Sequence, residues 1–359
     1  MNPEILINGR FQYRPLSGVE RYARAVTAQL EDRTRLLAPG RALSGLTGHL
    51  WEQLVLPRSL PPGSLLWSPA NSGPLLAHNQ VVTIHDLAPL DHPEWYQPAF
   101  VAWYRMLMPG LAQRAVHIIT PSNFSKKRIL ARLGVPAVKV TVIPEGVDLD
   151  VFRPAPQQVT SKVLSRLGIS SPYLLAVGAL PGRKNLERLL EAWKMILPIY
   201  PEMTLAVVGS RGRVFLVKTE LEVSKRVRWL GYLEDRDLAA LYSGALALLY
   251  PSLYEGFGLC LLEAMACGTP VLCSTAGALP EVAGEAALQI NCRDTPALAA
   301  GLHRLIADPS LRADLRLKGL ERAQEFRWEQ TAQLVWSVLT QAREAIALDS
   351  VCADVGWSG

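Results

Sequence analysis

The sequence predicts an α/β protein with two domains, each a doubly wound parallel sheet covered by helices. Three observations predict this class. The chain has 359 residues, which is more than one hydrophobic core usually serves. Short runs rich in Val, Ile and Leu alternate with longer helical patterns, as in parallel sheets with helical crossovers. This alternation stops at a Pro-rich, turn-like segment near residue 153 and then starts again.

The first predicted domain spans residues 1–153. Its expected strands are the short apolar runs 5–7, 65–67, 81–84, 118–120 and 140–143. Its expected helices, which have longer patterns with apolar residues three and four apart, are 19–30, 98–115 and 122–133.

The second predicted domain spans residues 154–328, and a long helix is expected within residues 329–359. The expected strands of this domain are 173–177, 204–208, 227–230, 245–250 and 271–274. The expected helices between them include 185–197, 236–243 and 259–266. Open sheets of this kind bind ligands beyond the carboxyl ends of their strands, so we expect the site in a cleft between the two domains.

Composition excludes several classes of protein. With 49% hydrophobic and 19% charged residues, the chain resembles an ordinary soluble protein. No basic segment followed by an apolar core opens the sequence, and the longest charge-free run is broken by Ser, Gly and Pro, so we expect neither a secretory signal nor a transmembrane helix. The five cysteines lack CxxC spacing and predict neither a zinc site nor a disulfide framework, which fits a reducing cytoplasm.

Charge is unevenly distributed along the chain. The formal net charge is +5, and residues 1–150 hold 15 Lys and Arg against 11 Asp and Glu. A basic surface of this kind can meet anionic lipid, nucleic acid or a phosphorylated substrate, and charge alone does not choose among them.

The stretch YEGFGLCLLEAMACGTP, residues 254–270, places Glu263 in an otherwise apolar helical run. A buried carboxylate needs a partner, because its desolvation costs roughly several kcal/mol unless hydrogen bonds or opposite charges replace the lost water. With Glu255 on the loop before the helix and Glu263 in its second turn, both carboxylates can face the end of the preceding strand. The glycines of EGFG let an anion approach backbone N–H groups at the helix start. The alternative is that Glu263 is a surface residue of a half-exposed helix.

A second stretch, VGALPGRKN, ends the strand 173–177 with a Pro/Gly turn. Arg183 and Lys184 follow, directly before Asn185, which is a good N-cap for the next helix. Two cations beside a helix N-terminus favour a diphosphate. In isolation such cations are more often solvated than functional, but here they follow a strand of the same sheet as the EGFG loop.

Together with VTIHDLAPLDHPEWY and VIPEGVD, these stretches resemble the retaining glycosyltransferases of family 4. The resemblance extends from PLSGVERYAR near the start to FRWEQTA near the end. It implies the GT-B fold, with two Rossmann-like domains facing each other across a cleft and a C-terminal helix that crosses back onto the first domain. The E-x7-E spacing of Glu255 and Glu263 is highly specific in this context.

The resemblance also implies roles for individual residues of the second domain. Glu255 matches the residue that contacts donor-sugar hydroxyls, and Glu263 matches the one that accepts hydrogen bonds from the nucleotide ribose. Arg183 and Lys184 match the basic pair that neutralises the diphosphate. The segment that lies against the sugar and diphosphate corresponds to Gly256, Phe257, Gly258 and Leu259.

Two further residues match positions of the first domain, and two departures stand out. His85 matches a histidine near the sugar, and Gly18 lies in the loop that faces the diphosphate. Many relatives have Arg where this chain has Ala179, so either Arg183 supplies more of the positive charge or the leaving group is held less tightly. Glu145 stands where Asn is common.

We expect no metal and no cofactor besides the nucleotide-diphosphate sugar, which is a co-substrate. Asp148 and Asp150 form a DxD string, but they lie in the apparent inter-domain link, where a hinge or capping role is expected instead. No HExxH motif or His/Asp cluster is present in the sequence. Two cations and a helix N-terminus can stabilise a diphosphate without Mg²⁺.

The resemblance implies transfer of a hexose, with mannose favoured, to a hydroxyl of a glycan or a polyprenyl-diphosphate-linked acceptor in surface-polysaccharide biosynthesis. No side chain is an obvious nucleophile, which favours a same-face mechanism over a double displacement without excluding the latter. Two other classes stay open. One is a nucleotide-sugar epimerase or hydrolase on the same fold, and the other is a non-catalytic nucleotide-sugar-binding subunit.

The expected location is the cytoplasm, with peripheral contact at the inner face of the plasma membrane as an open possibility. The helical stretch SNFSKKRILARLG carries four basic residues around an apolar stripe, and such a helix can lie on anionic lipid. A helix with one face on the sheet and one face in water explains the pattern equally well. We expect no nucleic-acid partner.

Overall fold

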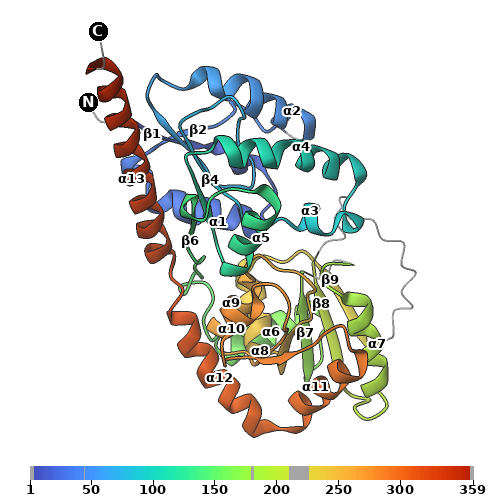
Figure 1. The fold of residues 1–359 in the computed structure, drawn as a ribbon. Coiled ribbons are helices and arrows are strands. Elements are labelled where there is room, and N and C mark those ends of the chain that lie inside the picture. The colour runs from blue at the N-terminus through green and yellow to red at the C-terminus, as the bar shows by residue number, and fades with distance from the viewer. Residues whose placement is uncertain (1–3, 44, 179–181, 210–225, 356–359) are drawn as a thin grey trace. The chain divides into compact units, whose positions relative to one another are not determined.

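The computed structural model describes residues 4–43, 45–178, 182–209 and 226–355. The chain divides into two compact units (Figure 1). Unit 1 comprises Met1–Leu90, Val101–Gly146 and Trp328–Gly359, and unit 2 comprises Asp91–Phe100 and Val147–Arg327. Residues 91–100 therefore pack with the second unit, although the sequence analysis included them in the first domain.

Unit 1 is built on a six-stranded sheet in the order β2-β1-β3-β4-β5-β6, and every neighbouring pair is parallel. Its strands are β1 Ile5–Asn8, β2 Arg35–Leu37, β3 Leu65–Ser68, β4 Gln80–Thr83, β5 His117–Thr120 and β6 Val140–Val142. The chain adds β2 on one side of β1 and β3 on the other. Strand order therefore reverses between β1 and β3, and such reversal points are where open sheets leave a crevice.

The helices of this part of the chain are α1 Gly18–Gln29, α2 Gly45–Leu50, α3 Ala88–Asp91, α4 Pro98–Arg114, α5 Asn123–Leu133 and α13 Trp328–Val355. Short turns of 3-10 or π-helix occur at η1 Gly9–Tyr13, η2 Glu31–Arg33, η3 Trp51–Val55, η4 Leu56–Ser59 and η6 Ala137–Lys139, whereas the 3-10 turn η5 Pro93–Trp95 belongs to unit 2. Helix α13 packs against α1, where the Tyr22 and Trp328 rings meet edge to face at 6.1 Å. The last helix thus belongs to the core of unit 1.

Unit 2 contains a second parallel six-stranded sheet, in the order β12-β11-β10-β7-β8-β9. Its strands are β7 Tyr173–Val177, β8 Thr204–Val208, β9 Val227–Gly231, β10 Ala247–Tyr250, β11 Val271–Ser274 and β12 Leu288–Ile290. The chain builds β7, β8 and β9 outward in one direction and β10, β11 and β12 in the other. Strand order therefore reverses between β7 and β10, which is the arrangement of dinucleotide-binding folds.

The helices of unit 2 are α6 Gln157–Leu167, α7 Leu186–Ile196, α8 Asp235–Gly244, α9 Leu259–Ala266, α10 Leu279–Ala283, α11 Thr295–Ala307 and α12 Pro309–Gln324. Helix α7 shows how the sequence fixes the packing. Its buried residues Leu186, Leu189, Leu190 and Trp193 recur at helical spacing and join the core formed with β7, β8 and β10. Burial of both faces explains why β7 and β8 are almost entirely apolar.

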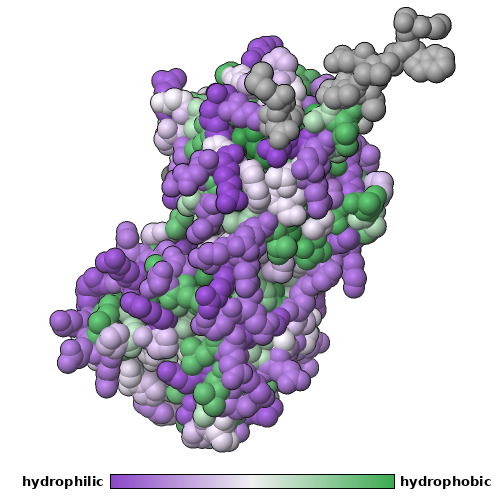
Figure 2. Space-filling view, turned by 90° about the vertical axis from the view of Figure 1, so that its left-hand side faces the viewer, coloured by the Kyte–Doolittle hydropathy of each residue, from purple (hydrophilic) through white to green (hydrophobic). Residues whose placement is uncertain are grey.

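Two smaller expectations can be compared with the structure. The side chain of Asp148 accepts hydrogen bonds from the backbone N–H groups of Asp150 (3.0 Å) and Val151 (3.1 Å), so the predicted capping role of the DxD string is confirmed. No helix among the described residues is long and apolar enough to cross a membrane. On the face shown in Figure 2, hydrophilic residues predominate and hydrophobic ones form smaller patches.

Candidate functional site

The candidate site lies where strand order reverses in unit 2. The loop after β7 carries Arg183 and Lys184, and the loop after β10 carries Glu255. Because β7 and β10 are parallel neighbours, their carboxyl ends lie at the same edge of the sheet. The topology therefore brings together two stretches that are about seventy residues apart in the chain.

Glu255 forms ion pairs with both cations. Its Oε2 accepts from Arg183 Nη2 at 2.8 Å, and its Oε1 accepts from Lys184 Nζ at 2.6 Å. The carboxylate side chain is 5% exposed, whereas the side chains of Arg183 and Lys184 are 19% and 16% exposed. Both cations thus reach the surface while holding a buried partner.

The charges of this cluster do not balance. Burial by itself raises the pKa of Glu255, but the positive charges of Arg183 and Lys184 outweigh it and lower this pKa from 4.5 to about 2. Glu255 is therefore an anion at neutral pH. With two cations and one anion, this trio has a net charge of +1. It lies beside the start of a helix, where an anionic ligand is favoured.

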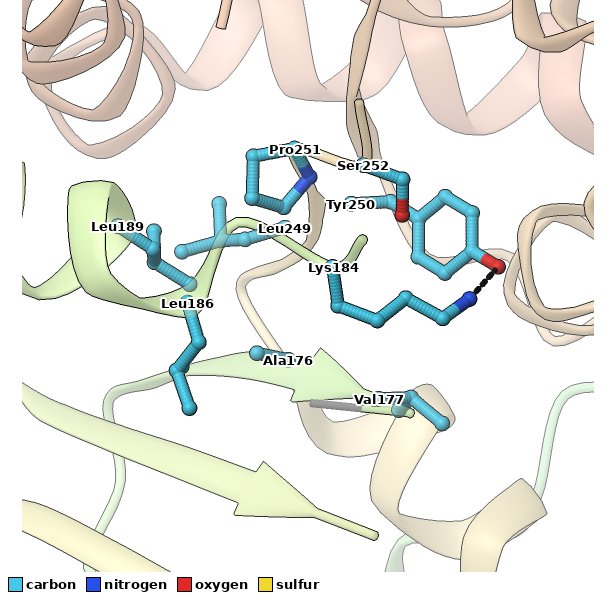
Figure 3. A pocket seen from close by; sticks show the side chains of 9 residues that line it. All are labelled: Ala176, Val177, Lys184, Leu186, Leu189, Leu249, Tyr250, Pro251 and Ser252. Atoms are coloured by element: carbon cyan, nitrogen blue, oxygen red, sulfur yellow. Dashed lines mark hydrogen bonds between the residues drawn. The ribbon is translucent and has the colours of Figure 1, made fainter. Parts of the chain in front are cut away.

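Tyr250 fixes the position of the Lys184 ammonium group. Its phenol oxygen accepts a hydrogen bond from Lys184 Nζ at 2.7 Å, and the ammonium lies 4.5 Å from the ring centroid. Figure 3 shows the lysine side chain extended across a small pocket toward this phenol, with Ser252 beside it. Burial raises the pKa of Tyr250 well above 10, so the phenol stays neutral and does not offset the charge of the lysine.

The backbone on either side of Glu255 is held by neighbouring loops. Arg183 Nε donates to the carbonyl of Tyr254 at 2.9 Å, and the N–H of Ala278 donates to the carbonyl of Glu255 at 2.9 Å. Gly277, with φ +66°, lies so close that a Cβ there would be 2.6 Å from the Glu255 nitrogen. Only glycine fits this approach. The carboxylate thus stands on a backbone fixed from two sides.

The EGFG loop leads into α9, as the sequence predicted. Gly258 takes φ +115° at the N-cap, and a Cβ there would lie 2.8 Å from a methyl of Leu279. The Phe257 ring packs edge to face on Phe326 at 5.8 Å, so this side chain is structural and its amide remains the group of interest. Leu259 is the first residue of the helix, and Gly256 precedes the loop's phenylalanine.

Glu263 is buried in α9, 3% exposed, so the alternative of a surface carboxylate is wrong. Its Oε2 accepts a hydrogen bond from the Tyr242 hydroxyl at 3.2 Å. The sequence analysis sought its partners on the ligand, whereas the structure provides one within the protein. Glu263 belongs to α9, whereas the trio of Arg183, Lys184 and Glu255 lies on the loops after β7 and β10.

Asn185 occupies the predicted N-cap position of α7, but it does not form the expected cap hydrogen bond. Its backbone is left-handed, with φ 56°, which turns the side chain away from the helix. The amide instead donates to the carbonyls of Pro251 (3.2 Å) and Cys292 (2.7 Å). Asn185 therefore ties the loop after β7 to the loops after β10 and β12.

The two candidate residues of unit 1 are placed differently. Gly18 is the first residue of α1. His85 is 4% exposed, and its Nδ1 lies 2.7 Å from Glu145 Oε1 while its Nε2 lies 3.0 Å from the carbonyl of Pro69. Both ring nitrogens thus have partners within the protein. Burial by itself lowers the pKa of His85, but the hydrogen bond and charge of Glu145 outweigh it and raise the pKa above 6.5.

Sequence reasoning missed Tyr250 and Gly277, and it predicted Asn185 for a different bond. A tyrosine that ends an apolar strand directly before the loop was the available signal for Tyr250. Nothing local marks Gly277, because its role depends on a loop from another strand. Ala179, the departure noted above, lies outside the described residues.

Among the described residues, no group of three or more His, Cys, Asp or Glu side chains is arranged to hold a metal ion. The expectation that the chemistry needs no metal stays a prediction. The four cysteines with described side chains are free thiols.

Two family models match the chain, one in each half. The model "Glycosyltransferase Family 4" matches residues 62–151, and the model "Glycosyl transferases group 1" matches residues 165–322. The O-antigen chain mannosyltransferase B of Escherichia coli is 34% identical over 69% of this chain and 67% of its own length. The MMP alpha-(1->4)-mannosyltransferase of Mycolicibacterium hassiacum is 30% identical over 88% of this chain and 77% of its own.

Solved structures show the same fold. The sucrose-phosphate synthase of Thermosynechococcus elongatus superposes with a TM-score of 0.75 at 23% identity, covering 96% of this chain and 100% of the other. The Anabaena protein HepE in complex with UDP-glucose gives 0.74 at 18% identity, covering 95% and 100%. Two parallel sheets, the cation-rich reversal point and these relatives agree: the chain belongs to family 4 of the retaining glycosyltransferases and is a glycosyltransferase with the GT-B fold.

Proposed function

We propose that this chain transfers a hexose, with mannose favoured, from a nucleotide-diphosphate sugar to a hydroxyl of a glycan or lipid-linked acceptor, with retention at the anomeric carbon. The single observation that carries the proposal is the pairing of Arg183 and Lys184 around Glu255 at the reversal point of unit 2. Mannose and a surface-polysaccharide acceptor are proposed because relatives of this chain are named O-antigen mannosyltransferases.

The trio can stabilise a departing diphosphate. As the bond from the sugar to the phosphate breaks, negative charge grows on the leaving oxygens, and cations already in place stabilise that charge without reorganisation. Arg183 and Lys184 are held in place by Glu255 and by Tyr250. We propose that the amides of residues 256–259 lie against the same phosphates and the sugar, at the start of α9.

Glu255 is a poor candidate for the nucleophile or the general base. Each of its oxygens is paired with a cation, and its pKa of about 2 makes it a weak base. We therefore propose that it contacts donor-sugar hydroxyls while fixing the two cations. The leaving phosphate then removes the proton of the acceptor hydroxyl on the same face of the sugar, and no covalent enzyme intermediate forms.

Glu263 is proposed to accept hydrogen bonds from the nucleotide ribose. The buried carboxylate already accepts one hydrogen bond from Tyr242, and a carboxylate offers further lone pairs for a ribose diol. For unit 1, we propose that Gly18 faces the diphosphate. Both ring nitrogens of His85 have partners within the protein. We therefore propose that His85 contacts the sugar through its backbone or through the carbon edge of its ring.

Contact with anionic membrane remains a proposal about α5. Lys126 of this helix donates to the carbonyl of Val140 at 2.7 Å, so this cation is directed at its own sheet edge and leaves fewer for lipid. Sedimentation with anionic vesicles, but not with neutral ones, would support contact. Equal binding to both kinds of vesicle, or to neither, would contradict it.

A donor panel tests the function directly. The protein is incubated with GDP-mannose, GDP-glucose, UDP-glucose and UDP-galactose, with and without a polyprenyl-diphosphate-linked acceptor, and release of the nucleotide is measured. We expect release from a mannose donor that depends on the acceptor. The product is then analysed by NMR, and the anomeric configuration of the donor is expected to be kept.

Each other outcome points to a different protein. Release without acceptor would indicate a hydrolase, and conversion of the donor sugar an epimerase. Tight donor binding with neither release nor conversion would indicate a nucleotide-sugar-binding subunit. Inversion at the anomeric carbon would contradict the same-face mechanism.

A further inference from the structure

We propose that the segment of residues 91–95 is a positioning element of the diphosphate site, and that Asp91 and Trp95 act on Arg183 through Tyr254 and Gly182. This inference rests on the proposed function. The segment belongs to unit 2, and its side chains lie against the two residues that precede Arg183 and Glu255 in the chain.

The first contact runs from Asp91 to Tyr254. The Tyr254 hydroxyl donates to Asp91 Oδ2 at 2.9 Å, and the tyrosine is 4% exposed. Its carbonyl accepts from Arg183 Nε at 2.9 Å, and the guanidinium carbon lies 5.9 Å from the centre of its ring. Tyr254 therefore contacts Arg183 with both its backbone and its ring, while Asp91 fixes the far end of the ring.

The second contact is between Trp95 and Gly182. Gly182 has φ +74°, and a Cβ at this position would be 2.9 Å from Trp95 Cδ1 and 3.3 Å from Nε1. The indole thus lies directly on the backbone that precedes Arg183. Its ring also stacks on His92, with centroids 4.0 Å apart and planes 13° apart, and the His92 ring meets Tyr254 edge to face at 5.5 Å.

These contacts affect the direction of one guanidinium group. Arg183 Nη2 donates to Glu255 while its Nε donates to the Tyr254 carbonyl, and a guanidinium binds a phosphate well only in a fixed orientation. Loosening Tyr254 or Gly182 would let Arg183 adopt other rotamers. The diphosphate would lose affinity, while the nucleoside part, held elsewhere, would not.

The experiment compares a nucleoside diphosphate with its monophosphate by titration calorimetry. The diphosphate is the one among GDP, UDP and ADP that the wild-type protein binds best. Tyr254→Phe and Asp91→Leu each remove the same hydrogen bond and are expected to weaken the diphosphate about threefold to tenfold. Asp91→Asn keeps an acceptor oxygen and is expected to bind within about twofold of wild type. The monophosphate affinity should be unchanged in all three variants.

Additivity gives an independent check. Because both substitutions remove the Asp91–Tyr254 hydrogen bond, the free-energy loss in the double variant Asp91→Leu/Tyr254→Phe should be smaller than the sum of the two single losses. Trp95→Ala should weaken the diphosphate without affecting the monophosphate. Glu202→Gln, an exposed residue that precedes β8 and lies outside the segment, is the control and should bind like wild type. If Asp91→Leu does not fold, Tyr254→Phe, which lacks only a hydroxyl, still tests the bond.

The outcomes separate two kinds of failure. Equal loss for the monophosphate and the diphosphate would show a general loosening and would overturn the positioning role, as would unchanged diphosphate affinity in Tyr254→Phe and Trp95→Ala. A wild-type protein that binds none of the three diphosphates would instead overturn the proposed function, and this inference with it.

Discussion

Both units have a point where strand order reverses, and each such point holds a carboxylate paired with a cation. In unit 1 the carboxylate is Glu52, which is 0% exposed. Its Oε2 accepts from Arg10 at 2.8 Å, and its Oε1 accepts from Asn8 and Ser72 at 2.8 Å each. One cation meets one anion, and the remaining oxygen lone pairs are used by neutral side chains.

The corresponding cluster in unit 2 has a different balance. Glu255 is nearly as buried as Glu52, but it is paired with two cations, and both of those reach the surface. Burial of the carboxylate therefore does not distinguish the two clusters. The two clusters differ in their excess of positive charge and in the exposure of their cations, and an anionic ligand needs both to bind. In the first cluster the carboxylate is neutralised and bonded within the protein. In the second cluster one positive charge is left that an anionic ligand can neutralise.

The largest effect on stability is expected at the first cluster. Glu52→Ala leaves Arg10 buried without a counter-charge, which costs about 3–5 kcal/mol of unfolding free energy. Denaturant unfolding followed by circular dichroism measures this loss. The double variant Arg10→Met/Glu52→Met removes both charges and should be less destabilised than Glu52→Ala. A loss below about 1 kcal/mol in Glu52→Ala would mean that the first cluster contributes little to stability, and its structural role would be contradicted.

The largest effect on turnover is expected at the second cluster. Lys184→Met removes one of the two groups that stabilise the leaving diphosphate, so turnover should fall about 10²- to 10³-fold. Its unfolding free energy should change by less than about 1 kcal/mol, because Arg183 still pairs with Glu255. Lys194→Met, on the exposed side of α7, is the matched control and should keep full activity. If Lys184→Met loses stability but keeps turnover, the second cluster has a structural role like the first and does not serve the reaction.

Much of the fold could be predicted from the sequence because buried strands are recognisable as short apolar runs. Every predicted strand is present within a residue or two, since strands covered on both faces must be apolar throughout. The edge strands β2 and β12 were missed. Each has only three residues, none of them fully buried and each strand with a polar residue, and so lacks an apolar run. Residues 91–100 could not be assigned to unit 2, because their contacts are with residues distant in the chain.

The site was predicted in part for a similar reason. Arg183, Lys184 and Glu255 follow strand ends that a parallel sheet must bring together, so their meeting could be foreseen. That Glu255 holds both cations could not, because this depends on side-chain direction. The partners of Glu263 and Asn185 were also unforeseen. Tyr242 comes from the preceding helix, and the left-handed backbone of Asn185 is not visible in its sequence.

Glu263 provides an intermediate case in the comparison. Its carboxylate is buried like that of Glu52, and it accepts a hydrogen bond from the neutral Tyr242 hydroxyl at 3.2 Å. Glu263→Gln keeps the size of the side chain and should weaken nucleoside diphosphate binding about tenfold, through loss of charge-assisted bonds to the ribose. Calorimetry with a diphosphate and with pyrophosphate measures this. Pyrophosphate lacks the ribose and should bind equally well to both proteins. Tyr242→Phe, which leaves the carboxylate in place, should bind the nucleotide better than Glu263→Gln does.

A smaller effect is expected from acid. Since the pKa of Glu255 is lowered from 4.5 to about 2 in the folded protein, its ion pairs stabilise the fold above pH 4.5, and this contribution is lost as pH falls from 4.5 toward 2. Wild-type protein should therefore lose more unfolding free energy between pH 5 and about pH 3 than Glu255→Gln does. Parallel curves for the two proteins would show that the cations do not hold Glu255 as an anion.

The smallest expected effect has the opposite sign and belongs to unit 1. The pKa of His85 is raised above 6.5 by Glu145, so the charged pair stabilises the fold fully below pH 6.5 and loses its contribution as pH rises through the folded value. The slope cannot exceed that of one proton, about 1.4 kcal/mol per pH unit. Unfolding measured from about pH 6 to 9 should show this decline in wild type and a flatter curve in His85→Gln. Because acid weakens the Glu255 trio and base weakens the His85 pair, one pH series on the two single variants assigns each slope to its own unit. A wild-type curve that rises up to about pH 6.5 and stays flat above it would contradict the raised pKa and would mean that His85 is neutral in the fold.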